Sequence, residues 1–502
     1  MTPDRRAAYA VGPGAVSVGG DVHAPITTNV YGGDGPMFTV ETPPPELPHE
    51  FADLAALREQ PSKLLNARRR VIPFSGRARE LDELAAWRDH GPRRAARLIY
   101  AAGGEGKTRL AARAAEHAAA AGWTVGWARH RTDTPGGGAP LTVAGDHPLL
   151  IVVDYAERWP LTHLQSLLDR YARHTGPLRV LLLARSLSWW SVADSICDKL
   201  GIITGVPVPL EPLAGTDTER QALFEAACRR FAEIYGLPAS TAFAVPGGPA
   251  DRAYGSVLTV HMAALAVVDA YAQHQLAPRG ARDLSRYLLN REYHYWTVLH
   301  GEHRSATAAR AAFIACITGG LPQPAGAALL ARSGLTEAAG TSAQQILDAH
   351  ARCYPPTTAG TVLEPLYPDR LAEDFIGLTL RTDQPDSLAD TWCGSSLTDV
   401  FAREAGRVPG HAGRGLIFLA AAAATWPHVG TALRTLLHAD PSLAVDAGGP
   451  ALLAITPYAD AEIAAAISRH LTERSIDLHP AAALLSCGIL QVSLLLNSRR
   501  GT

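Results

Sequence analysis

Short, continuous apolar runs recur between residues 98 and 183 and are separated by segments with helical spacing. The runs are Leu98–Ala101, Thr124–Ala128, Leu149–Val153 and Leu178–Leu183. An unbroken apolar strand needs cover on both faces, so this pattern indicates a parallel sheet between two layers of helices. We therefore predict a three-layer α/β domain over residues 71–215.

From residue 217 onward the apolar positions recur almost wholly at helical spacing,. This spacing predicts helices at Asp217–Tyr235, Ser256–Gln273, Asp283–Leu299, Thr307–Gly319, Ala325–Gly334 and Ser342–Tyr354, followed by a strand pair around Thr361–Pro368. We predict a helical domain over 216–300, a winged-helix-like domain over 301–385 and an α-helical, repeat-like region over 386–502.

The first 40 residues are rich in glycine and contain two short stretches, 15–22 and 26–31, in which apolar and polar residues alternate. Strands this short do not fold alone. Two interpretations stay open: a β-like element that docks onto a partner or onto copies of itself, or an unstructured leader. Residues 41–70 are predicted to form a Pro-rich linker with a short helix at Phe51–Leu65,.

The composition is that of a soluble globular protein of two to four domains, with 502 residues, 47% hydrophobic and 19% charged,. A net charge of −2 gives no general attraction to nucleic acid or to an anionic membrane,. Six scattered cysteines show no metal or redox spacing, and the N-terminus lacks a signal peptide, so we expect a cytoplasmic protein,. Ala481–Leu496 is too short and too interrupted to span a membrane, which favours a packed helix over an anchor,.

The stretch Leu98–Leu110 joins an apolar strand, a glycine-rich turn and the start of a helix. Glycines let consecutive N–H groups point at phosphate oxygens, a lysine reaches the β- and γ-phosphates, and a hydroxyl binds Mg²⁺. The usual first glycine is Ala101 here, and a chance glycine turn is the alternative, but the strand–loop–helix order favours a phosphate-binding loop. The predicted contacts are Ala102, Gly103, Gly104, Glu105, Gly106, Lys107, Thr108 and Arg109.

A carboxylate for Mg²⁺ is expected where a neighbouring strand ends. Asp154 follows Leu149–Val153 and is the predicted second metal-side ligand beside Thr108. Glu157 is the candidate for orienting the attacking water, and Tyr155 stands where a fast ATPase carries a second acid, which predicts slow hydrolysis. Arg185 ends the next strand and is predicted to sense the γ-phosphate,.

Together these residues resemble the signal-transduction ATPases with numerous domains, the STAND class of P-loop NTPases, over about Val71 to Leu380. The segment Pro73–Leu81 is similar to the class's entry motif, whose backbone lines the adenine, which implies contacts from Phe74, Gly76 and Arg77. The class also has a helical lid and a winged helix. The lid's Gly-x-Pro turn is absent, so the contact implied for His261 competes with a core role, and Tyr367-Pro368-Asp369-Arg370 is the nearest candidate for the winged-helix His-Asp motif.

The resemblance implies a switch in which ADP holds the lid and winged helix closed, and ATP with Mg²⁺ favours an open, oligomerising state. Its output in relatives is defence or transcriptional control. The expected partners are nucleotide, further copies of the chain, and an unknown protein at the C-terminal helices or the N-terminal segment. Two alternatives stay open: an AAA-type ATPase or P-loop kinase with rapid turnover, and a scaffold that binds nucleotide without hydrolysis.

Overall fold

A computed structural model describes residues 37–42, 57–130, 141, 145–358, 360–380, 388–471 and 478. The two alternating stretches at 15–22 and 26–31, the glycine-rich insert 135–140 and the apolar segment 481–496 lie outside these residues. No helix of the described residues is both long enough and apolar enough to cross a bilayer.

The first half of the chain forms a sheet with seven strands in its described part, in the order β1-β3-β4-β5-β2-β6, with β7 also paired to β2. The strands are β1 (Phe38–Glu41), β2 (Arg94–Tyr100), β3 (Thr124–His130), β4 (Leu149–Val153), β5 (Leu178–Ala184), β6 (Ile203–Thr204) and β7 (Val208–Pro209). All pairs are parallel except β1 with β3. Because β5 lies between β2 and β4, the three strands end side by side at one edge.

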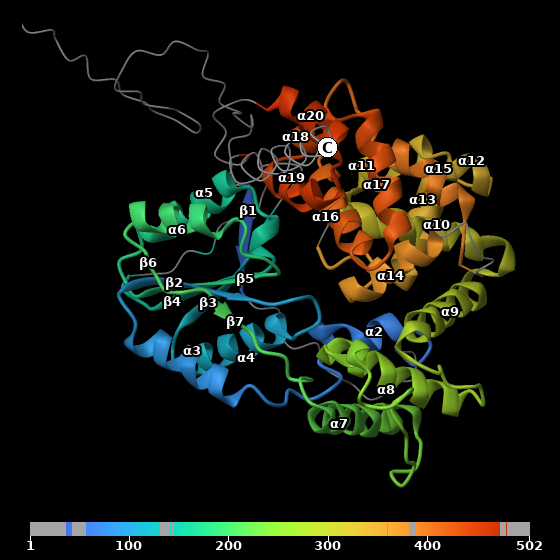
Figure 1. Cartoon of the computed structure of the whole chain (residues 1–502), viewed down its shortest axis with the longest axis horizontal. Coiled ribbons are helices and arrows are strands. Elements are labelled where there is room, and N and C mark those ends of the chain that lie inside the picture. Colours follow the sequence, from blue (N-terminus) through green and yellow to red (C-terminus); the bar gives the residue numbers. More distant parts are fainter. Residues whose placement is uncertain are drawn as a thin grey trace, which may run out of the picture.

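Helices cover both faces of this sheet (Figure 1). They are α3 (Ala78–His90) and α4 (Lys107–Ala120) on one face, and α5 (Leu161–Ala172) and α6 (Trp190–Lys199) on the other. Alternate strand residues feed the two cores: Leu150 and Val152 pack toward α3 and α4, and Ile151 and Val153 toward α5 and α6. The predicted three-layer α/β fold is confirmed.

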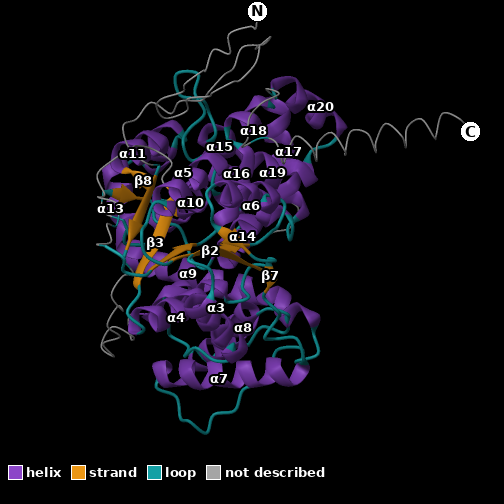
Figure 2. Cartoon of the chain, turned by 90° about the vertical axis from the view of Figure 1, so that its left-hand side faces the viewer, coloured by secondary structure: helices purple, strands orange, loops and turns teal. Residues whose placement is uncertain are grey.

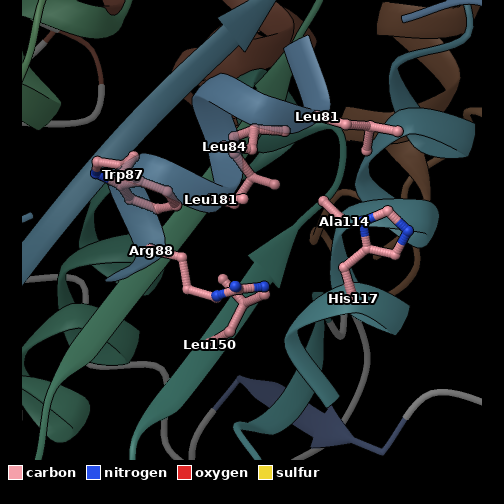
Figure 3. Close-up of a pocket in the computed structure, with 9 residues that line it drawn as sticks. Leu81, Leu84, Trp87, Arg88, Ala114, His117, Leu150 and Leu181 are labelled. Atoms are coloured by element: carbon pink, nitrogen blue, oxygen red, sulfur yellow. The ribbon is translucent and has the colours of Figure 1, made fainter. Parts of the chain in front are cut away.

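The contact of α3 and α4 with the sheet is close-packed (Figure 3). Leu81 and Leu84 of α3 face Ala114 and His117 of α4 above the strand residues Leu150 and Leu181, and the gap among them is about 10 Å³. A space of that size holds at most one water molecule, so this is a packing interface and not a ligand site.

The strand β1 was not predicted, because the Pro-rich sequence after it suggested a linker. Val40 of β1 packs so closely on β3 that a methyl group built on Gly126 would lie 2.5 Å from it. Glu41 also pairs with Arg129 at 2.8 Å. The end of the predicted 1–40 segment, with Glu41 at the start of the expected linker, therefore closes one edge of the sheet. Within the expected helix Phe51–Leu65, the described residues contain the helix α2 (Pro61–Leu65). The 3₁₀ turn η1 (Ala67–Arg69) follows α2, and another, η2 (Ala156–Arg158), follows β4.

The middle of the chain forms α7 (Asp217–Tyr235), η3 (Arg252–Tyr254), α8 (Val257–Ala272) and α9 (Ala281–His300). Helix α7 begins at a capping box, in which the Thr216 side chain and Glu219 satisfy each other's backbone N–H groups, and ends at Gly236 in a left-handed conformation,. Figure 2 shows α7 at the far end of the molecule from the C-terminal helices.

Residues 302–379 form α10 (Glu302–Thr318), α11 (Gln323–Arg332), α12 (Leu335–Ala339), α13 (Ala343–Cys353) and α14 (Asp369–Thr379). The strand pair expected at Thr361–Pro368 is instead one short strand, β9 (Thr361–Val362), paired antiparallel with β8 (Leu321–Pro322). The partner strand β8 lies about forty residues upstream. It has only two residues, which is too short for an alternation of apolar and polar residues to be recognised in the sequence. The winged-helix assignment stays a prediction.

The last described helices are α15 (Thr391–Val400), α16 (Ala412–Ala423), α17 (Pro427–Ala439), α18 (Ser442–Asp446), α19 (Gly449–Ile455) and α20 (Ala461–His470), with η4 (Thr456–Tyr458) between the last two. They pack with α10 and α14 into one apolar core, which also contains the α7–α9 helices. Five cysteines in the described residues are buried free thiols.

The packing of α14 on the loop before α17 generates the first prediction. A methyl group built on Gly377 would lie 2.3 Å from the Trp426 ring, whereas nothing lies within 4 Å of the same position at Gly394 in α15. Gly377→Ala should therefore destabilise the protein by about 1–3 kcal/mol through overpacking. Gly394→Ala should stabilise it by about 0.5–1 kcal/mol through helix propensity. Chemical unfolding of both variants measures the difference, and equal effects would contradict the close approach.

Candidate functional site

The turn between β2 and α4 has the backbone of an anion-binding loop. Gly104 and Gly106 adopt φ values of 88° and 86°, which residues with a side chain rarely reach,. The Lys107 ammonium donates to the carbonyls of Ala101 and Ala102, at 2.6 and 2.9 Å. Burial and the nearby Arg185 lower the pKa of Lys107 to about 8, against an opposing pull from Glu157 and Asp154,.

Two predicted metal-side residues meet across neighbouring elements. The Thr108 hydroxyl donates to one carboxylate oxygen of Asp154 at 2.9 Å, and the Tyr155 backbone N–H donates to the other at 3.0 Å. Burial raises the pKa of Asp154, and these two hydrogen bonds oppose the rise. Tyr155 has a φ of 53°, which turns the chain sharply after β4 and aims Asp154 back at α4,.

The entry segment is held to the loop by Arg77, a buried residue at a φ of 63°. Its guanidinium donates to the Glu105 carbonyl at 3.2 Å, to the Glu211 carbonyl at 2.5 Å and to the Glu80 side chain at 2.8 Å. Arg77 therefore joins the entry motif, the phosphate loop and the chain after β7 without pointing into solvent. Its predicted adenine role rests on backbone, and its side chain is committed to these bonds.

The other entry residues lie on the same side of the loop. Gly76 has a φ of 71° and lies against Leu213, and Phe74 packs at the edge of the α3–α4 core. Arg109 donates to the Ile72 carbonyl at 3.0 Å, so the third residue of α4 fastens the segment that precedes the motif.

Helix α8 touches the phosphate loop with its N-terminus. The Leu258 backbone N–H donates to the Gly104 carbonyl at 3.1 Å, and Ser256 caps the helix. His261 lies one turn further along. Burial and, second, the Arg109 charge lower its pKa to about 4, so His261 is neutral beside Arg109 at neutral pH. The predicted nucleotide contact of His261 stays a prediction.

Arg185 connects the phosphate loop to a helix almost two hundred residues away. A methyl group built on Gly103 would lie 3.3 Å from its guanidinium. The same guanidinium pairs with Glu373 at 2.7 Å and with Asp369 at 3.1 Å, both on α14. Burial lowers the pKa of Arg185, but these two carboxylates outweigh it and the net change is upward.

Arg158 is a functional candidate that sequence reasoning missed. It pairs with Asp369 at 2.8 Å and lies 3.9 Å over the Tyr155 ring. Burial raises the pKa of Asp369, yet Arg158 and Arg185 lower it further, so the carboxylate stays ionised. The sequence held part of the information needed to find Arg158. It follows Asp154 by four residues, and its partner Asp369 belongs to the Tyr367-Pro368-Asp369-Arg370 segment that was singled out.

One carboxylate oxygen of Glu157 has no hydrogen-bond partner among the described residues. Its Oε2 atom is buried and, within the described residues, accepts no hydrogen bond. Burial raises its pKa, with Arg158 and Arg185 opposing. The negative charge of Glu157 also raises the pKa of Lys107, against the effect of burial. A buried, unsatisfied carboxylate oxygen at this place fits a group that receives a hydrogen bond from a bound molecule.

One protein-family model matches the part of the chain that contains the phosphate loop. Residues 65–196 match the family model described as Novel STAND NTPase 5. The resemblance to STAND-class NTPases is thereby confirmed for this part of the chain. The match covers the entry motif, the phosphate loop, Asp154 and Arg185, and it supports a nucleotide-binding NTPase.

Two solved structures match the chain at low similarity. NtrX from Brucella abortus, in complex with ADP, is 13% identical with a TM-score of 0.30, and the match covers 60% of this chain and 72% of NtrX. The Orc1 protein of Aeropyrum pernix, in complex with DNA, is 15% identical with a TM-score of 0.28 and coverages of 60% and 91%. A search of curated proteins gives no significant match.

The pKa of Lys107 generates a prediction about pH. A polyanionic nucleotide needs the charged ammonium, which the free protein loses above about pH 8. Binding above that pH must take up a proton, so the dissociation constant of ADP should rise by up to about tenfold per pH unit between pH 8 and 9.5. Isothermal titration measures it. Lys107→Arg, which stays charged, should show a flat profile, and a flat wild-type profile would contradict the burial of this lysine.

Proposed function

We propose that this protein is a nucleotide-controlled switch, which binds ATP and ADP, hydrolyses ATP slowly and changes its domain arrangement with the bound nucleotide. The observation that supports it is the position of Arg185. Its guanidinium lies against Gly103 of the phosphate loop and is held by Asp369 and Glu373 of α14. A charge that belongs to the nucleotide site is thus shared with the helical half of the chain.

The residues present fit a nucleotide with its metal. Gly104 and Gly106 hold the loop open to phosphate oxygens, and Lys107 supplies the counter-charge,. Thr108 and Asp154 offer two oxygen ligands of the kind that Mg²⁺ prefers, 2.9 Å apart,. Bound Mg²⁺ would neutralise charge on the phosphates.

Slow hydrolysis follows from the residues after β4. Tyr155 stands where a second acid would activate water, and its ring packs under Arg158 at 3.9 Å instead of reaching the loop. Glu157 is the remaining carboxylate that could accept a proton from water, and its buried Oε2 atom is available for this,. A single carboxylate, placed three residues beyond Asp154, is consistent with slow ATP hydrolysis that returns the switch to its ADP-bound state and does not drive mechanical work.

The switch itself is a competition for Arg185. With a γ-phosphate present, Arg185 gains a second anionic partner at the loop, and its pairs with Asp369 and Glu373 on α14 weaken. With ADP the carboxylates keep the guanidinium, and α14 stays docked on the sheet edge. Release of α14 would free the helical half for assembly with further copies of the chain.

The nucleotide content of the purified protein tests this function directly. Denatured wild-type protein should release tightly held ADP, and its turnover should be slow compared with motors and kinases, which reach about 1–100 s⁻¹. Lys107→Ala should release none, because the phosphates lose their counter-charge. An empty site with rapid turnover would favour the AAA-type or kinase alternative, and normal binding by Lys107→Ala would overturn the site.

A second prediction concerns the link to α14. Asp369→Asn removes the carboxylate shared by Arg158 and Arg185, so it should speed ADP release by about tenfold, a change worth about 1.4 kcal/mol in the closed arrangement,. Stopped-flow release of a fluorescent ADP analogue measures the rate. Asp169→Asn breaks an exposed pair with Arg173 and should change nothing,. Equal rates in the two variants would contradict the proposed link.

A further inference from the structure

A cavity of about 1270 Å³ lies between the α/β half and the C-terminal helices. Thr108 and Ala112 of α4 and the ends of β3 and β4 form one wall. The opposite wall comes from α16, α18, α19 and the residues before α14. The volume exceeds the 300–1,000 Å³ usual for a ligand pocket, so the space is large enough for a small molecule.

This cavity is not the nucleotide site described above, although the two adjoin at Thr108, Arg109 and Asp154. None of the residues from Gly103 to Lys107 lines it, and neither do the entry residues Phe74 and Gly76. The phosphates and the base are expected at those positions. The cavity therefore extends from the metal-side residues away from the nucleotide.

Its lining is strongly cationic. Among the described lining residues there are seven arginines and four carboxylates, namely Arg68, Arg69, Arg70, Arg109, Arg129, Arg158 and Arg414 against Glu116, Asp154, Asp369 and Asp446. Some of these charges are already matched: Arg70 pairs with Glu116, and Arg158 with Asp369. Asp446 is matched from outside the lining by Arg403 at 2.8 Å.

Three lining arginines have no carboxylate partner among the described residues. Arg109 donates to the Ile72 carbonyl at 3.0 Å, and Arg414 donates to the carbonyls of Cys316 and Ile317 at 2.7 and 2.9 Å. Arg68 lies 5.8 Å from the centre of the Tyr367 ring. Carbonyls and a ring satisfy donors without neutralising charge, so the described lining lacks the anion that would balance these three arginines.

Flat side chains lie beside these arginines. Trp127 and Trp159 line the side formed by the sheet, Tyr367 lies next to Arg68, and Ile417 of α16 adds an apolar contact. Arginine with aromatic and aliphatic neighbours suits a ligand that has an anionic group and a flat apolar part.

We infer that this cavity is a second binding site, for a small anionic molecule with a flat apolar portion, held by Arg414 and Arg68 and covered by the tryptophans. Because its walls belong to both halves of the chain, an occupant stabilises the closed arrangement and slows release of ADP. The effect on release rests on the proposed function, whereas the site itself does not.

The experiment is a fluorescence titration of the full chain with 1-anilinonaphthalene-8-sulfonate, an aromatic sulfonate, with saturating Mg²⁺ and ADP. Wild-type protein should bind about one equivalent. Arg414→Gln should weaken binding by about tenfold through loss of a charge-assisted contact. Since Arg414 also holds two carbonyls of α10, the exposed Arg68→Gln and the cavity-filling Ala112→Leu serve as independent variants, and each should weaken binding at least threefold.

The matched controls are Arg434→Gln on α17, at a half-buried position, and Ala120→Leu on α4, at an exposed one; both side chains lie outside the cavity. Both should bind the probe as the wild type does. Absence of saturable binding by the wild type, unchanged binding by all three cavity variants, or displacement of the probe by ADP would overturn the inference. If the wild type binds no ADP, the proposed function fails, yet the titration without nucleotide still decides the site.

Discussion

The ionised carboxylate of Asp369 holds the two halves of this protein together. It lies between Arg158 of η2, the turn that follows β4, and Arg185, which directly follows β5, and it belongs to the first turn of α14. The helix dipole favours a negative charge at that end. Without Asp369, Glu373 alone would face the two guanidinium groups, and their repulsion would oppose docking of α14,.

This interaction matters because α14 is packed on so much else. It contacts α9 and α10 on one side and α16 and α17 on the other, and its Gly377 lies directly against Trp426. A change in the Arg158–Asp369–Arg185 cluster is therefore felt by the whole helical half. Close-packed elements move as units and do not deform gradually, which is the property that a two-state device needs.

The α/β half could be predicted closely from the sequence. Leu149–Val153 matches β4 at both ends, because a continuous apolar run is a local signal. In the helical half Asp217–Tyr235 matches α7, because apolar residues at helical spacing are a local signal too. The approach of Thr108 to Asp154 followed from strand order. What was missed depends on distant pairing: β1 with β3, β9 with β8, and Arg158 with Asp369. No local pattern shows which surfaces two segments bury against each other when they lie far apart in the sequence.

The distance between the two halves tests the account most directly. Spin labels at Ala120→Cys on α4 and Thr435→Cys on α17, both at exposed positions, would report it by pulsed electron resonance. With Mg²⁺ and ADP we expect one narrow distribution for the wild type. With a non-hydrolysable ATP analogue, the labelled protein that also carries Asp369→Asn should show a longer distance than the wild type shows with ADP. An unchanged distribution, in a protein that binds both nucleotides, would contradict a switch built on this carboxylate.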